Sequence, residues 1–139
     1  MTDPMPFDKL KAFLESSPFH RFLGLELIAA DPAEQRVVIR MPFRPEIGRG
    51  AVPGDVHGGP IASLIDTAGD FALVMMLNFG VPTINFRTDY LRLAVNTSLT
   101  ATAKVVRLGK SIGTVDVEVH DDDGRLVAIG RGTYATRET

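Results

Sequence analysis

A narrow polar stripe interrupts the most apolar segment of this chain. Ser63, Asp66 and Asp70 follow Gly59 by four, seven and eleven residues, with apolar side chains between them. At 3.6 residues per turn, these positions share about one face of a helix. Burying a carboxylate costs several kcal/mol unless it is hydrogen-bonded or paired. Because Asp66 lies past the first turn, neither capping nor the helix dipole accounts for it, and it is the best candidate for chemistry.

The residues just before this stripe are suited to binding an oxyanion. His57 precedes Gly58 and Gly59, and unpaired N–H groups at a helix N-terminus form an electropositive pocket. Glycine lets a ligand come close to these N–H groups. An acyl-transfer site needs such donors together with a base or a nucleophile. We therefore expect Gly58 or Gly59 to be the donor and Asp66 the base or nucleophile, while His57 either takes part in catalysis or caps the helix.

Helix geometry limits how these groups can work together. Seven residues separate Gly59 from Asp66, which is roughly 10 Å along the helix axis, whereas a base must lie about 3 Å from its proton or act through one water. One helix cannot easily bring both groups to the same carbonyl. Two antiparallel helices can, with Gly59 of one chain facing Asp66 of the other. The spacing therefore predicts an obligate homodimer with a composite site.

The segment that carries the stripe has the pattern of a buried helix. Apolar residues from Ile61 to Leu77 surround it on nearly every side, Pro60 is tolerated in its first turn, and Gly80 and Pro82 end it. A second helical pattern covers about residues 8–22. Runs of β-branched and alternating apolar residues predict strands at 25–30, 36–41, 83–93, 98–108, 114–120 and 125–135, and residues 42–56 are expected to form a loop.

Short turns at residues 108–111 and 121–124 predict hairpins and therefore antiparallel neighbours. The arrangement that buries the central helix is an α+β fold in which one long antiparallel sheet curls around it. At 139 residues, with no repeat and no linker, the chain is expected to form a single domain over residues 1–139.

Composition disfavours several kinds of function. The net charge of −2 gives no general basic field for nucleic acid. With no cysteine and three histidines that lack ligand spacing, neither thiol chemistry nor a zinc site is expected, and we predict no metal or cofactor. The N-terminus lacks the layout of a signal peptide, and no apolar run approaches the roughly 18 residues that span a bilayer. We expect a cytoplasmic protein that does not bind membranes.

The segment His57-Gly58-Gly59-Pro60-Ile61-Ala62-Ser63-Leu64-Ile65-Asp66 resembles the signature of hotdog-fold thioesterases of the phenylacetate-degradation (PaaI-like) type. The likeness continues through residues 83–86, 89–92, 106–110 and 123–128, and it covers the chain from about Leu23 to Thr133. It implies the hotdog fold and the hydrolysis of an aryl-, short- or medium-chain acyl-CoA to the free acid and CoA.

The resemblance also implies roles for individual residues. Asp66 matches the general base or nucleophile of the family, and the amide of Gly58 or Gly59 polarises the thioester carbonyl beside His57. A hydroxyl residue at the position of Thr83 helps to position water. The family typically forms dimers that pair into tetramers, and it needs no metal.

For the substrate, Lys110 matches a place where basic residues meet the CoA phosphates, and Arg107 and Ser63 are further candidates for binding it. Ser63 can also have a purely structural role, as can Asp70, by bonding across the dimer. The turn that contains Lys110 follows a predicted strand, so its charge is expected to be exposed.

One departure from the family pattern lies six residues before the histidine. Many members carry an asparagine there, and this chain has Ala51. Either Arg49, Glu46 or Asp55 takes the polar role, or turnover is weakened. Two alternatives to a thioesterase stay open: a hotdog hydratase or dehydratase that pairs a histidine with an acidic residue, and a non-catalytic domain that binds acyl-CoA.

Overall fold

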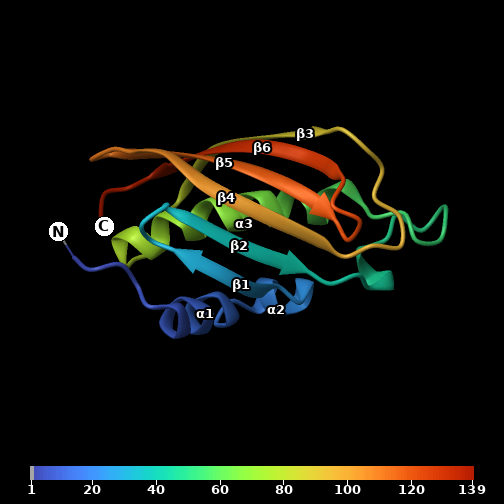
Figure 1. Cartoon of the computed structure of the whole chain (residues 1–139), viewed down its shortest axis with the longest axis horizontal. Coiled ribbons are helices and arrows are strands. Elements are labelled where there is room, and N and C mark those ends of the chain that lie inside the picture. The colour runs from blue at the N-terminus through green and yellow to red at the C-terminus, as the bar shows by residue number, and fades with distance from the viewer. Residues whose placement is uncertain (1) are drawn as a thin grey trace.

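One long helix, α3 (Gly58–Leu77), lies against one face of a six-stranded sheet in the computed structural model, which describes residues 2–139 (Figure 1). The strands are β1 (Glu26–Asp31), β2 (Arg36–Met41), β3 (Thr83–Tyr90), β4 (Leu99–Leu108), β5 (Ile112–Asp121) and β6 (Leu126–Ala135). Their order is β1-β2-β4-β5-β6-β3, and every neighbouring pair is antiparallel. The expected α+β architecture of one antiparallel sheet with one central helix is confirmed.

The sheet and α3 meet through an apolar layer made by alternate residues of each strand. Val115, Val117 and Val119 of β5 supply part of this layer, and all three are buried. On β6 the layer contains Gly130, where an added Cβ would collide with Ile65 of α3 and the Arg87 carbonyl, and Gly132, where it would collide with the Tyr134 ring. The missing side chain at Gly130 lets the helix pack closely on the strand, and the one at Gly132 leaves room for the ring.

By length and composition alone, α3 is long and apolar enough to cross a membrane. The sequence was expected to contain no apolar segment of that length. Its buried apolar residues are Ile61, Leu64, Ile65, Ala68, Phe71, Ala72, Leu73, Val74 and Met75. One flank is less covered than the all-round apolar pattern predicted, because Ser63, Asp66 and Asp70 are only half-buried. The helix thus has a packed face and a more open polar face.

Two short helices, α1 (Phe7–Glu15) and α2 (Pro18–Leu23), lie beside β1 at the edge of the sheet (Figure 1). Leu10 and Leu14 are buried and attach α1 to the core. Gly24, with φ of 69°, ends α2 in the left-handed conformation that favours glycine. The expected N-terminal helical region is therefore present as two helices.

Apart from shifts of one or two residues at the ends of other strands, two features differ from those predicted from the sequence. β3 ends at Tyr90, earlier than expected, because the N–H groups of Leu91 and Arg92 both donate to the Val127 carbonyl and the ladder stops there. The loop before α3 contains a single 3-10 turn, η1 (Pro45–Ile47), which the glycine-rich pattern did not reveal.

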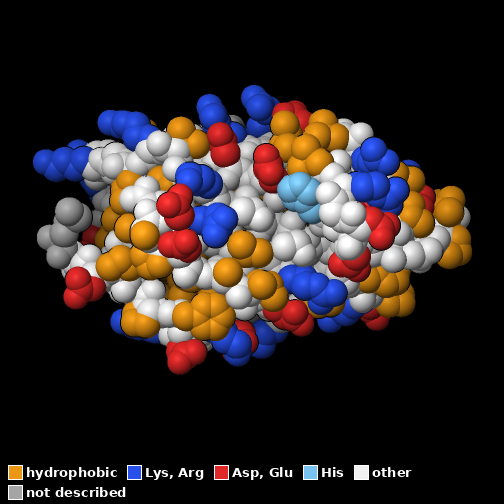
Figure 2. Space-filling view, in the orientation of Figure 1, with side chains coloured by type: hydrophobic (Ala, Val, Ile, Leu, Met, Phe, Trp, Pro, Cys, Tyr) orange, Lys and Arg blue, Asp and Glu red, His pale blue; other side chains and the backbone are white. Residues whose placement is uncertain are grey.

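The outer face of the sheet carries interspersed charges of both signs (Figure 2). Arg131 donates to the two carboxylate oxygens of Asp116 at 2.6 and 2.9 Å, and Lys104 donates to Glu34 at 3.1 Å. The hydrogen bond from Arg131 lowers the pKa of Asp116. Exposed pairs of this kind add little stability, so the fold depends mainly on the apolar layer beneath them.

Candidate active site

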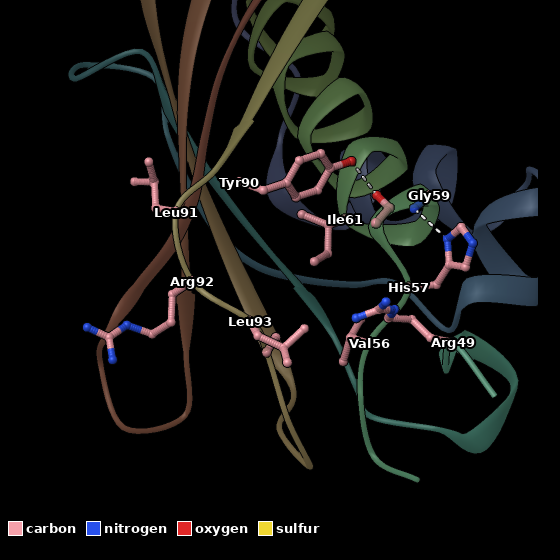
Figure 3. A pocket seen from close by; sticks show the side chains of 11 residues that line it. Arg49, Val56, His57, Gly59, Ile61, Tyr90, Leu91, Arg92 and Leu93 are labelled. Atoms are coloured by element: carbon pink, nitrogen blue, oxygen red, sulfur yellow. Dashed lines mark hydrogen bonds between the residues drawn. The ribbon is translucent and has the colours of Figure 1, made fainter. Parts of the chain in front are cut away.

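The start of α3 determines which backbone amide can face a ligand. His57 precedes the helix, and its Nδ1 accepts the N–H of Gly59 at 2.8 Å (Figure 3). Pro60 has no N–H, and the N–H of Gly58 donates no hydrogen bond within residues 2–139. Of the two glycines predicted to offer an oxyanion donor, Gly58 is therefore the one with an unused amide. His57 has the capping position, and an accepting Nδ1 requires the proton of its neutral ring to be on Nε2.

Tyr90 fixes the same helical turn from the opposite side (Figure 3). Its hydroxyl donates to the Gly58 carbonyl at 2.7 Å, and a Cβ added to Gly58 would lie only 3.1 Å from the Tyr90 Oη. From within the helix, the Ser63 hydroxyl donates to the Gly59 carbonyl at 3.0 Å. The first turn is thus held by side-chain hydrogen bonds on several sides, and Ser63 has a structural bond within its own chain.

A cleft of about 570 Å³ opens at this helix start. Its walls are mostly apolar and come from Val56, Ile61, Leu91, Leu93 and Ala94. Its polar groups belong to Arg49, His57, Tyr90 and Arg92, together with the backbone of the two glycines (Figure 3). An apolar cleft with a few polar groups around a free amide has the character of a small-molecule site.

Arg49 is the loop residue that reaches this cleft, whereas Ala51, Glu46 and Asp55 do not line it. The Arg49 N–H donates to the Asp55 carbonyl at 2.8 Å, and its guanidinium lies 3.8 Å from the buried Asp55 carboxylate. Of the three residues considered as a substitute for the usual asparagine, Arg49 therefore has the suitable position, and Asp55 orients it.

Asp66 lies farther along α3, on the open polar face. Its Oδ1 accepts the hydroxyl proton of Thr83, the first residue of β3, at 2.9 Å. The buried Tyr134 hydroxyl donates to the backbone carbonyl of Asp66 at 3.0 Å and fixes the turn that carries the carboxylate. Burial, with the charges of Asp66 and Asp70, raises the pKa of Tyr134, so this hydroxyl stays a neutral donor.

Asp66 does not line the cleft at the helix start. Eight residues separate it from Gly58, which corresponds to roughly 12 Å along the helix axis. The structure therefore brings Asp66 together with Thr83, and it brings His57 together with the two glycines. It does not bring these two groups together within one chain.

Arg107 and Lys110 lie farther still from the helix start. Both are exposed, at the end of β4 and in the turn between β4 and β5. This turn and the loop that leads into α3 are at opposite ends of the molecule (Figure 1). Within one chain these basic side chains are not part of the cleft.

The sequence reasoning missed both tyrosines of the chain as site residues. Tyr134 belongs to an alternating strand, and only the glycines around it, Gly132 on β6 and Gly69 on α3, hint that a ring fills the space between helix and strand. Tyr90 lies in a segment that resembles the family, but its bond to Gly58 depends on where β3 ends. Among residues 2–139, no three His, Asp or Glu side chains form a cluster that would hold a metal ion.

Comparison with known protein families identifies the family of this chain. The sequence model of the thioesterase superfamily matches residues 53–128, which include the helix start, Asp66 and Thr83. The chain belongs to the thioesterase superfamily. It is therefore a thioester hydrolase, and the sheet wrapped around α3 is the hotdog fold of that superfamily.

Solved structures and curated relatives support the PaaI-like assignment. A crystal structure of a thioesterase superfamily protein is 37% identical, with a TM-score of 0.87, and the match covers 92% of this chain and 96% of that one. The E. coli PaaI protein from the phenylacetic acid degradation operon is 29% identical, with a TM-score of 0.81 and coverage of 91% and 89%. The medium/long-chain acyl-CoA thioesterase YigI of Salmonella typhimurium is 29% identical over 139 residues, which covers 88% of this chain and 87% of that protein.

Proposed function

We propose that this chain hydrolyses acyl-CoA thioesters, with Asp66 as general base or nucleophile and the Gly58 amide as oxyanion donor. The observation that carries this proposal is the bond from Thr83 to Asp66, because it holds a carboxylate on the open face of α3. The free Gly58 amide at an apolar cleft supplies the second requirement of acyl transfer. A relative named as an acyl-CoA thioesterase supports the choice of CoA as the thiol.

In the general-base route, Asp66 takes a proton from water while the water oxygen attacks the thioester carbonyl carbon. The resulting oxyanion accepts the Gly58 N–H, the carbon–sulfur bond breaks, and the CoA thiolate leaves with the proton that Asp66 took from water, which restores the carboxylate. In the nucleophilic route, an Asp66 oxygen attacks the carbonyl carbon, CoA leaves, and water then cleaves the mixed anhydride. Rapid quenching followed by mass spectrometry separates the routes, because only the second adds the mass of the acyl group to the chain.

We infer that a second copy of the chain completes the site. Asp66 and Gly58 of one chain are too far apart along α3 to act on one carbonyl. β3 is an edge strand whose side chains are mostly exposed, including Ile84 at 57% and Phe86 at 36%. An edge strand with exposed apolar side chains is suited to pairing with its own copy. Such pairing around a twofold axis would place two α3 helices antiparallel, with Gly58 of one near Asp66 of the other.

The same arrangement bears on Lys110 and Arg107. An added Cβ at Gly113 would touch Leu73, so the β4–β5 turn lies near the level of Leu73 on α3. That level is about 22 Å along the axis from Gly58 of the same chain. If Asp66 of an antiparallel copy lies at the level of Gly58, the β4–β5 turn of that copy is only about 10 Å from Gly58 along the helix axis. We therefore propose that Lys110 and Arg107 of the second copy, rather than of the same chain, meet the CoA phosphates.

The acyl group is expected to be apolar, since the cleft walls are. Its class is tested with a panel of phenylacetyl-CoA and short-, medium- and long-chain saturated acyl-CoA substrates. Because the chain has no cysteine, a thiol reagent reacts only with the CoA that is released. We expect CoA release that is lost in Asp66→Asn. Binding of the substrate without CoA release would contradict the proposal and favour the non-catalytic alternative. CoA release from a saturated substrate would exclude a hydratase or dehydratase, because such an enzyme releases no CoA.

A further inference from the structure

Asp70 is a second carboxylate on the open face of α3, one turn beyond Asp66, and the proposed reaction leaves it without a role. One oxygen, Oδ1, is shut off from solvent and has no hydrogen-bond partner among residues 2–139. The backbone N–H of Val81 lowers the pKa of Asp70 and partly offsets the effect of burial. A buried carboxylate oxygen without a donor disfavours the charged form, so a protonated state is favoured at this position.

The groups that face Asp70 give its charge little support. On its own helix the neighbouring ionisable group is Asp66, which is of like sign. From β6 it faces Tyr134, a neutral hydroxyl, and from the segment after the helix only the Val81 backbone. No lysine or arginine of the described residues contributes to its titration. Burial and the Asp66 charge raise the pKa of Asp70 to about 7, so Asp70 is mostly neutral below pH 7 and becomes charged above it.

We propose that Asp70 is a positioning residue of this site, whose ionisation determines how readily Asp66 accepts the proton of the attacking water. The inference rests on the proposed role of Asp66. When Asp70 is charged, protonation of Asp66 relieves a like-charge repulsion one helical turn away, and water is activated more easily. When Asp70 is neutral, this relief is absent. The spacing of four residues on one helix face and the unpartnered oxygen carry the argument.

The first test compares the pH dependence of kcat in the wild-type enzyme, Asp70→Asn and the control Asp123→Asn. The control removes one negative charge from an exposed hairpin position, where the side chain is 79% exposed. We expect the wild-type kcat to rise roughly two- to fivefold through pH 7 and the control to follow it. Asp70→Asn should stay at the low-pH rate of the wild type, with KM little changed. A step near pH 7 that persists in Asp70→Asn would overturn the proposal.

The second test does not depend on activity. Carboxyl carbon NMR of the wild-type protein should show a signal that titrates near pH 7 and is missing in Asp70→Asn. In Asp66→Asn the same signal should titrate at lower pH, because the neighbouring charge is gone. An unchanged midpoint in Asp66→Asn would overturn the coupling between the two residues. A wild-type protein that shows the coupling but releases no CoA from any acyl-CoA would contradict the proposed function and leave the carboxyl pair itself established.

Discussion

The two faces of α3 differ in what they contact and in what their residues can do. The face against the sheet carries fully buried apolar residues such as Leu64, Ile65 and Met75. The opposite face carries Asp66 and Asp70, which are half-buried and hydrogen-bonded only at some of their oxygens. One helix thus separates the residues that stabilise the fold from those available for chemistry. Substitutions on the two faces should therefore affect different measurements.

The largest effect is expected on the polar face, from Asp66→Asn. The amide keeps the shape of the side chain and can still bond to Thr83, but it is neither a base nor a nucleophile. We expect kcat to fall by about a thousandfold or more, with an unchanged circular dichroism spectrum and a melting temperature no lower than that of the wild type. A variant that keeps more than about a tenth of the wild-type kcat would remove Asp66 from the proposed chemistry.

The matching change on the packed face is Ile65→Ala. Ile65 is fully buried and contacts β6 at Gly130, so its truncation leaves a cavity in the apolar layer. We expect the free energy of unfolding in urea to fall by about 2–5 kcal/mol. At a temperature where the variant remains folded, kcat should stay within a few-fold of the wild type. If kcat falls by much more than a few-fold while the variant is still folded, the two faces are not separate in function.

A smaller effect on activity is expected from Thr83→Val. Valine has nearly the same shape but leaves the Asp66 Oδ1 without its donor. Losing one hydrogen bond to a charged group should lower kcat by about tenfold. Thr83→Ser is the matched control, since it keeps the hydroxyl and should retain most of the activity. Equal losses in both variants would show that the packing of Thr83, rather than its hydroxyl, is what matters.

The smallest effect is a pH-dependent gain in stability for Asp70→Asn. Folding raises the pKa of Asp70 from 3.8 to about 7, so the native state loses stability as pH rises between these values and regains none of it above 7. Asparagine removes this loss. The melting temperature of Asp70→Asn should therefore exceed that of the wild type by a few degrees at pH 8, and the gap should narrow as pH falls toward 4.5. A gap that is the same at both pH values would mean that Asp70 titrates normally in the folded protein.

Much of the fold follows from the sequence because periodicity is strong here. The alternating valines of β5 and the apolar run of α3 predict a strand and a buried helix, and both are present with nearly the expected bounds. The separation of Gly59 from Asp66 also follows from helix geometry alone. These features depend on local spacing, which a single sequence records directly.

The contacts that individual side chains make could not be predicted in this way. That Gly58, rather than Gly59, keeps a free amide depends on the His57 side chain turning back to cap the helix. The bond from Tyr134 to Asp66 joins residues far apart in sequence, and it forms only because small residues open a space between α3 and β6. The position of Arg49 in the cleft likewise depends on how a buried Asp55 shapes the loop.

The central claim is that Gly58 and Asp66 serve one thioester from two copies of the chain. Mixing Asp66→Asn subunits with Gly58→Pro subunits tests it most directly. Proline removes the amide at the first helical position, where it is tolerated, and the extended conformation of His57 suits a following proline. Gly58→Ala is the control, because its added Cβ also comes close to Tyr90 but the backbone N–H is kept.

The Asp66→Asn and Gly58→Pro variants should each be inactive alone. After unfolding and refolding together at equal amounts, half of the dimers are mixed and each mixed dimer holds one intact site, so the account predicts recovery of about a quarter of the wild-type activity. Subunit exchange is verified by native mass spectrometry of differently tagged chains. Mixed dimers that form in the expected amount and remain inactive would contradict the composite site.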